Sequence, residues 1–401
     1  MKKTGNKVDT SNLISRKVKK LAPSGIRAFF DLVLGMEDVV SLGVGEPDFV
    51  TPWNIRETGI FSIEQGFTSY TSNKGLYKLR LIIHRMLKQS FGLEYCAQDE
   101  MLITVGVSEA LDLAMRAIIN PGDEIIVPEP CYVSYGPVVE LAGGNPVFLP
   151  TKQKDGFKIT PSMLDGACNK KTKAILLNYP SNPTGSTYSK VELEKINKVC
   201  KKHKLIVISD EVYGDLTYDC EHVPYPTLKG AKDYTLYLNG LSKAYAMTGW
   251  RIGYACGPKP IIAAMTKIHQ YTILCATITS QMAACEALHS GGRSLKEMKR
   301  EYKRRREFMY KNLNEMGLIC SKPRGAFYIF AQIEASGMNC LEFASKLLEE
   351  EKVAVVPGVA FGLSYDNYVR MSYSTGYPQL KEAVIRMKKF MGRHQKNIKR
   401  K

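Results

Sequence analysis

The chain has 401 residues and 44% hydrophobic content, which predicts a globular protein of two or three lobes with a sizeable core and excludes a disordered chain. Its formal net charge is +17, but no helix-turn-helix, zinc-finger or RNP pattern accompanies the charge, so we expect a solvated basic surface and no nucleic-acid partner. Ten scattered cysteines without a C-x-x-C pair, and no apolar run long enough to span a membrane, predict a soluble cytoplasmic protein with no structural metal site.

The N-terminal part, residues 1–52, is predicted to form an arm and part of a small domain. A helix is expected over 26–35, and a short strand after it breaks into the glycine loop Gly43–Phe49. Glycines suit a backbone that must approach a ligand closely. A basic amphipathic helix is expected over Leu79–Lys88.

Residues 53–295 are predicted to form a large domain in which short apolar runs alternate with helical segments. Near-continuous apolar strands divided by helices indicate a mostly parallel sheet covered on both faces. Ligands bind such sheets at the carboxyl ends of the strands. The expected strands are Met101–Val105, Glu124–Val127, Val147–Leu149, Ala174–Leu177, Leu205–Ile208, Thr235–Leu238 and Arg251–Ala255.

The C-terminal part, residues 296–401, is predicted to be a smaller α+β domain completed by the N-terminal segment. A basic helix over Leu295–Met316 is expected to connect the two domains, and a short apolar strand is expected to carry Arg370. The predicted fold class is therefore α/β, with a large domain built on a mostly parallel sheet and a smaller domain formed by both termini.

Three motifs follow the predicted strands in a fixed order. Asn182-Pro183-Thr184-Gly185 forms a rigid turn, Asp210 to Tyr213 follows a buried strand, and the segment Ser242-Lys243 precedes Arg251 by eight to nine positions. Together they resemble the class I and II aminotransferases of the aspartate aminotransferase family, which are fold type I enzymes that use pyridoxal phosphate. The resemblance covers residues from about 26 to about 391.

The resemblance implies a complete set of cofactor contacts. Lys243 would hold the cofactor covalently, and a lysine that attacks a carbonyl needs a lowered pKa. Asp210 would keep the pyridine nitrogen protonated, which draws electrons from the substrate. Gly240 stands where the family often has a serine, so one phosphate donor is missing, and Ser242 or water is expected to replace it. The remaining implied contacts are Val107, Ser108 and Arg251 to the phosphate, Asn182 and Tyr213 to the phenolic oxygen, and Tyr132 and Val212 on the two ring faces.

The resemblance also implies how substrate and a second subunit are arranged. Gly45 and Asn182 would contact the substrate, and Arg370 would bind its α-carboxylate with a forked, bidentate contact. Tyr70 would reach across a homodimer interface to the partner's cofactor phosphate. Ser108 occupies a position where some aspartate enzymes have lysine, which weakens the expectation of a dicarboxylate substrate.

The implied activity is a ping-pong transfer of an amino group from an L-amino acid, such as aspartate, an aromatic or a related donor, to a 2-oxo acid. The alternative enzyme is a pyridoxal phosphate-dependent carbon-sulfur lyase on the same scaffold. The alternative that is not an enzyme is a non-catalytic binding protein. The presence of Lys243, Asp210 and Arg370 together argues against it.

Overall fold

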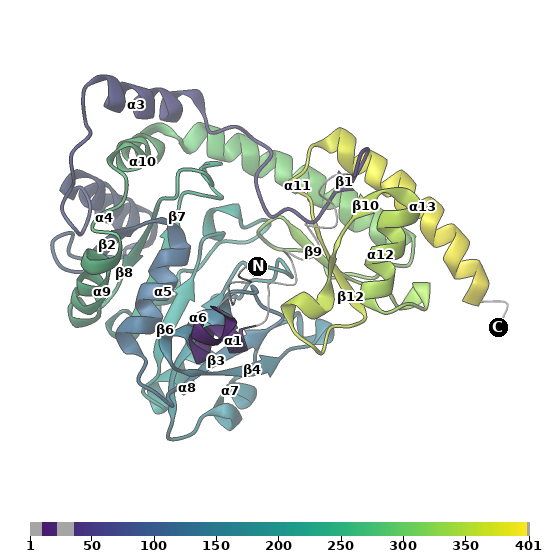
Figure 1. Ribbon diagram of the computed structural model, residues 1–401, viewed down its shortest axis with the longest axis horizontal. Coiled ribbons are helices and arrows are strands. Elements are labelled where there is room, and N and C mark those ends of the chain that lie inside the picture. Colours follow the sequence, from purple (N-terminus) through teal and green to yellow (C-terminus); the bar gives the residue numbers. More distant parts are fainter. Residues whose placement is uncertain (1–9, 22–35, 399–401) are drawn as a thin grey trace, which may run out of the picture.

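The computed structural model describes residues 10–21 and 36–398, so the helix expected over 26–35 lies outside the described residues. Its largest element is a seven-stranded sheet in the order β2-β8-β7-β6-β5-β3-β4 (Figure 1). Within this sheet β8 is antiparallel to both neighbours, and the other pairs are parallel. The strands are β2 (Met101–Thr104), β3 (Glu124–Glu129), β4 (Asn145–Pro150), β5 (Thr172–Asn178), β6 (Ile206–Asp210), β7 (Thr235–Gly240) and β8 (Gly253–Cys256).

Both faces of the sheet are covered by helices, and successive strand residues point to opposite faces. In β3, Ile125 and Val127 pack with helices on one side, while Ile126 packs on the other. This explains why the strands are almost continuously apolar in sequence. The first side is covered by α5 (Gly106–Ile118), α6 (Tyr135–Ala142) and α9 (Lys259–Thr272), and the second by α4 (Tyr77–Phe91), α8 (Lys190–Lys202) and α10 (Ile278–Ser290).

Some helices begin at a residue whose side chain accepts a hydrogen bond from the first turn. In α8 the Ser189 hydroxyl accepts from the Glu192 N–H, and the Glu192 carboxylate accepts from the Ser189 N–H, which forms a capping box. The remaining helices of four residues or more are η1 (Thr10–Leu13), α1 (Arg16–Lys20), α3 (Trp53–Glu64), α7 (Pro161–Ala167), α11 (Gly292–Glu315), α12 (Cys340–Glu351), η7 (Gly358–Phe361) and α13 (Tyr377–Ile398).

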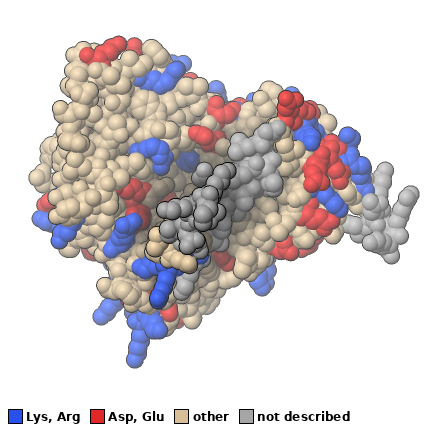
Figure 2. Space-filling model, in the orientation of Figure 1, with Lys and Arg blue, Asp and Glu red and all other residues tan. Residues whose placement is uncertain are grey.

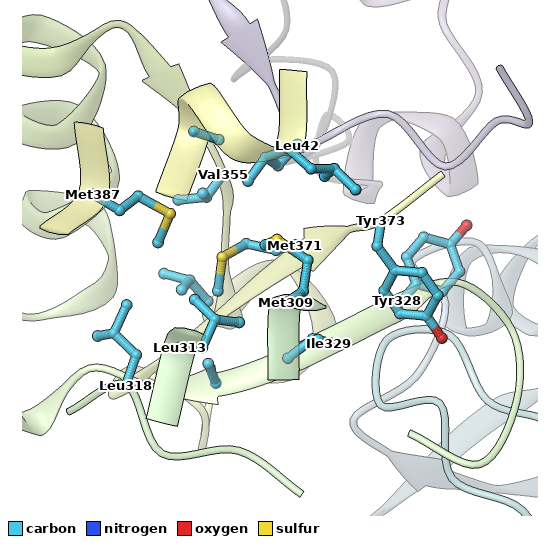
Figure 3. Close-up of a cluster of buried hydrophobic side chains, with 14 of the residues drawn as sticks. Leu42, Met309, Leu313, Leu318, Tyr328, Ile329, Val355, Met371, Tyr373 and Met387 are labelled. Atoms are coloured by element: carbon cyan, nitrogen blue, oxygen red, sulfur yellow. The ribbon is translucent and has the colours of Figure 1, made fainter. Parts of the chain in front are cut away.

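A smaller unit combines segments from both ends of the chain. β1 (Val40–Ser41) pairs in parallel with β10 (Val353–Ala354), and β11 (Val356–Pro357), β12 (Tyr368–Ser372) and β9 (Tyr328–Gln332) form an antiparallel sheet. Its core is continuous from the N-terminal segment to the last helix. Figure 3 shows that core, with Leu42, Met309, Leu313, Leu318, Ile329, Val355, Met371 and Met387 converging between the strands and helices.

Helix α11 connects the large unit to the smaller one (Figure 1). Its apolar positions enter the small core, and two of its arginines are buried because each has an acidic partner. Arg305 Nη1 lies 2.8 Å from Asp48 Oδ1, and Arg306 Nη2 lies 2.5 Å from Asp219 Oδ2. Part of the basic content of α11 is therefore structural. On the surface of the smaller unit basic and acidic side chains are interspersed (Figure 2).

The structure confirms the predicted α/β class with a mostly parallel sheet and a smaller α+β unit built from both ends of the chain. Among the described residues, no helix combines the length and the apolar character that crossing a membrane requires.

Candidate active site

A cavity of about 350 Å³ lies where the carboxyl ends of the large sheet's strands face the smaller unit. The turns after β2, β5, β6 and β7 supply most of its lining, and β9 and β12 supply Tyr328 and Arg370. The fold thus brings together residues that are far apart in the sequence. The predicted site residues that line this cavity are Gly45, Val107, Ser108, Tyr132, Asn182, Asp210, Tyr213, Ser242, Lys243, Arg251 and Arg370.

Lys243 places its amine at the centre of this lining. Its Nζ donates a hydrogen bond to the Gly45 carbonyl at 2.9 Å. Burial, helped by the positive charges of Arg251 and Arg370, lowers the pKa of Lys243 from 10.5 to about 8, against the raising effect of Glu46 and Asp210. Such an amine reaches the neutral, nucleophilic form near physiological pH far more readily than a surface lysine does.

Asp210 ends β6 and is almost fully buried. The Tyr135 hydroxyl donates to its Oδ2 at 2.7 Å, and the Val212 N–H donates to its Oδ1 at 3.3 Å. Burial raises the pKa of Asp210 from 3.8 to about 6, against the lowering effect of these hydrogen bonds. A carboxylate held this way favours a nearby cation or protonated nitrogen, because that partner restores the electrostatic stabilisation lost with water.

The N-terminus of α5 and Arg251 form an anion-binding corner. Free N–H groups and the positive end of the helix dipole are available around Val107 and Ser108. Gly106 has φ +74°, and a Cβ there would lie 2.6 Å from Arg251 Nη2. The absence of a side chain at Gly106 is what lets the guanidinium approach the helix terminus. The corner suits a phosphate group.

The structure also gives a reason for Gly240, where a serine was expected from the resemblance. A Cβ at Gly240 would lie 3.0 Å from the Val107 Cγ2 atom and 3.1 Å from the backbone of Gly253. The Val107 side chain thus takes up the room that a serine would need. Ser242, which the sequence offered together with water as a substitute donor, lines the cavity two residues later.

Arg370 is buried in β12 with its guanidinium directed into the same cavity. Its Nη1 donates to Asn182 Oδ1 at 3.0 Å, and its Nη2 donates to the Gly43 carbonyl. The guanidinium carbon lies 4.6 Å from the ring centre of Tyr328. Its Nε has no hydrogen-bond partner among the described residues. The group is therefore a fixed, buried cation with an unused donor, as a carboxylate-binding residue requires.

Tyr213 and Tyr328 join the two units in the wall of the cavity. Their hydroxyl oxygens are 2.8 Å apart, and the Tyr328 hydroxyl also lies 3.4 Å from the Gly45 carbonyl oxygen. Tyr132 and Val212 line the cavity as well, and the Tyr132 ring meets the Tyr135 ring edge-on at 5.6 Å.

Tyr70 is the predicted site residue that the structure places elsewhere. It is 82% exposed and does not line the cavity. Its position before α4 leaves it free to contact another molecule, but within this chain it contributes nothing to the site.

With this geometry established, comparison with known proteins identifies the family. A model described as Aminotransferase class I and II matches residues 37–387. The chain belongs to this family. Its members depend on pyridoxal phosphate, so the chain is a pyridoxal phosphate-dependent transaminase, as the sequence motifs predicted.

Individual aminotransferases are similar over almost the whole chain. The Bacillus subtilis protein YugH is 52% identical across 95% of this chain and 99% of its own length. The aspartate aminotransferase of Pyrococcus abyssi is 43% identical across 94% of this chain and 98% of its own. Among solved structures, the Thermus thermophilus aspartate aminotransferase with maleate is 37% identical, with a TM-score of 0.90 over 94% of this chain and 99% of that one.

The residues of this aminotransferase fit its cofactor. A phosphate matches the corner between the α5 N-terminus and Arg251, and the gap kept open by Gly106 shows that this corner is built for close approach. The carboxylate of Asp210 suits a protonated ring nitrogen, and the amine of Lys243 suits the cofactor's aldehyde. The donor set is consistent with pyridoxal phosphate at every polar position.

Two contributors to the site were missed by reasoning from the sequence. Tyr135 donates to Asp210, and Tyr328 contacts both Tyr213 and the Arg370 guanidinium. Tyr135 follows β3 in the same Pro-rich segment as Tyr132, and this position was the signal that could have indicated it. Tyr328 lies in an apolar run that by pattern is only a small-domain strand.

Proposed function

We propose that this aminotransferase uses Lys243, Asp210 and Arg370 as its acid-base, electronic and carboxylate-binding groups. The observation that carries the proposal is their convergence in one cavity, from strands β6 and β12 and the turn after β7. Pyridoxal phosphate, when bound, supplies the electron-withdrawing ring that makes the substrate α-hydrogen acidic. The rest of the reaction depends on how the chain positions and protonates its groups.

The amine of Lys243 moves the proton. Its lowered pKa lets it accept a proton as a base and return it as an acid at nearly the same pH. Asp210, held by Tyr135, would keep the cofactor's ring nitrogen protonated. Tyr213 supplies a hydroxyl that is already ordered by Tyr328. Each group is thus fixed before substrate arrives, which lowers the reorganisation that the reaction requires.

Arg370 binds the carboxylate that all α-amino and 2-oxo acids share. Asn182 and the Gly43 carbonyl hold the guanidinium in place, and Gly45 lies close enough to Lys243 to border the substrate. Because Arg370 belongs to the smaller unit and Lys243 to the large one, a bound substrate would contact both units and exclude water from the reacting carbon.

The amino donor is aspartate, an aromatic amino acid or a related residue. Relatives with names of both kinds support this range: aspartate aminotransferases and an aromatic aminotransferase of Pyrococcus horikoshii, whose structure is 41% identical with a TM-score of 0.87. The test is a single-turnover panel of amino donors followed by 2-oxoglutarate. Release of ammonia and pyruvate from cystathionine without any 2-oxo acid would contradict transamination and indicate a lyase.

The functional unit is a homodimer in which Tyr70 contacts the partner's cofactor phosphate. Support comes from an exposed apolar surface on and beside α3, which is more hydrophobic than a monomer needs to display. Its members include Trp53 at 57%, Phe61 at 52% and Ile63 at 59% exposure. Light scattering after gel filtration tests the dimer.

We further propose the domain limits 53–295 and 296–401 with 1–52. We also propose a cytoplasmic location, which the ten free thiols support.

A further inference from the structure

Asn178 lines the active-site cavity without belonging to the cofactor or substrate contacts that the family resemblance implies. It is the last residue of β5, and the register of the parallel pair places it beside Asp210, the last residue of β6. Its side chain ends in an amide, which offers both hydrogen-bond donors and an acceptor. An amide at this place in the sheet can join two neighbouring segments at once.

The Asn178 side chain does join two segments of the large unit. Its Nδ2 donates to the Asp210 carbonyl at 3.0 Å, and its Oδ1 accepts from the Asn182 N–H at 3.0 Å. The first contact anchors the side chain on a strand of the buried sheet, and the second reaches the turn after β5. Because one contact needs an amide donor and the other an acceptor, a single orientation of the amide satisfies both.

Asn182 continues the connection to the smaller unit. Its side chain is buried, and its Oδ1 accepts from Arg370 Nη1 at 3.0 Å. The amide oxygen is thereby engaged, which leaves the amide nitrogen as the end that donates toward the cofactor's phenolic oxygen. Three consecutive bonds of 3.0 Å therefore run from the Asp210 backbone through two asparagines to Arg370.

The turn that carries Asn182 has its own hydrogen bonds, but they do not hold this residue. The Ser181 N–H donates to the Ser186 carbonyl, and the Gly185 N–H donates to the Ser181 carbonyl, so the turn closes on itself. The Asn182 N–H takes no part in either bond and is held by Asn178. A buried N–H that loses its partner is costly, so the place of Asn182 depends on the Asn178 side chain.

We propose that Asn178 is a positioning residue that sets the spacing between the Asp210 strand and the guanidinium of Arg370. The inference rests on the proposed function, in which Asp210 holds the cofactor ring and Arg370 holds the substrate carboxylate. The bridge between them decides where the α-carbon of the substrate lies relative to the ring. Catalytic groups must be held within about 0.5 Å of their productive geometry, which a continuous hydrogen-bonded bridge can achieve.

The probes are succinate and 3-phenylpropanoate, titrated calorimetrically into the holoenzyme. Each has a carboxylate for Arg370 but no amino or oxo group, so neither can react. Asn178→Leu keeps the size of the side chain and removes both bonds, and we expect it to weaken the tighter probe about three- to tenfold. In the Arg370→Lys background the same substitution should weaken binding less than about twofold, because the bridge no longer ends on a guanidinium.

Asn197→Leu is the matched control. Asn197 is a buried amide on α8 that also joins two segments, since its Nδ2 donates to the Lys229 carbonyl and its Oδ1 accepts from the Tyr225 hydroxyl. It does not line the active-site cavity, so its loss should leave the affinity for the probes unchanged in both backgrounds. If Asn178→Leu lacks native circular dichroism, Asn178→Ser takes its place, because a serine hydroxyl is too short to make both contacts.

Two results overturn this inference alone. One is unchanged affinity in the Asn178 variant while Arg370→Lys weakens the probes. The other is an equal loss of affinity in both backgrounds, which would make Asn178 a merely structural residue that does not act through Arg370. Unchanged affinity in Arg370→Lys itself is a different failure, because it contradicts the proposed role of Arg370 and removes the end point of the bridge.

Discussion

Replacement of Arg370 by lysine tests how the site holds every substrate. Lysine keeps the positive charge but loses the planar fork, and it cannot reproduce both the contact to Asn182 and the contact to Gly43 while facing a carboxylate. At least one charge-assisted hydrogen bond to the substrate is lost, and such a bond contributes about 1.5–3 kcal/mol. We therefore expect kcat/KM to fall by about 10- to 150-fold for each amino and oxo substrate alike.

The assay compares half-reaction rates for a dicarboxylic, an aromatic and an aliphatic amino acid, with a simple amine that lacks a carboxylate as a fourth substrate. The amine should be little affected. Arg386→Lys is the matched control, because Arg386 Nη2 donates to both carboxylate oxygens of Asp38, at 3.0 and 3.1 Å, on the surface of the smaller unit, and the substitution should leave all rates unchanged. If Arg370→Lys loses one side-chain class and keeps the others, Arg370 recognises the side chain instead.

Asp210→Asn should lower kcat far more than it raises KM, and equal kcat values with cofactor bound would refute its electronic role. In the apo-protein the raised pKa of Asp210 adds stability that is complete below pH 3.8 and is lost as the pH rises through about 6. Wild type should therefore lose about 2 kcal/mol relative to Asp210→Asn between pH 4 and 7 in urea titrations, and a constant difference would contradict the burial argument. Gly106→Ala should weaken cofactor binding more than tenfold in equilibrium dialysis, whereas Gly92→Ala, also at positive φ but with open space around the new Cβ, should not. Tyr70→Phe should weaken cofactor binding with the dimer intact, and unchanged affinity would place Tyr70 outside the site.

The sequence was sufficient for the sheet because buried parallel strands are apolar along their whole length. The expected strand at Thr235–Leu238 is β7 (Thr235–Gly240), and the expected helix at Leu295–Met316 is α11 (Gly292–Glu315). Patterns of this kind depend on local periodicity, which the chain shows directly. The ends shift by a few residues because capping and packing decide them.

Contacts between distant segments could not be read in this way. The pairing of β1 with β10 joins the two ends of the chain inside the smaller unit, and the contact of Tyr213 with Tyr328 depends on how the two units pack; neither follows from local pattern. The roles given to Lys243 and Asp210 came from the family resemblance, and the structure adds the burial that shifts their pKa values. The steric reason for a glycine at position 240, which is the Val107 side chain beside it, is likewise visible only in three dimensions.

The most direct test of the proposed mechanism is reduction of the holoenzyme with borohydride, followed by peptide mapping of the labelled lysine. We predict a single modified peptide with the cofactor attached at Lys243, because this amine is the one that burial shifts to a pKa of about 8 inside the active-site cavity. Lys243→Ala should give no labelled peptide and no turnover. A label on any other lysine, or full amino transfer by Lys243→Ala, would contradict the assignment.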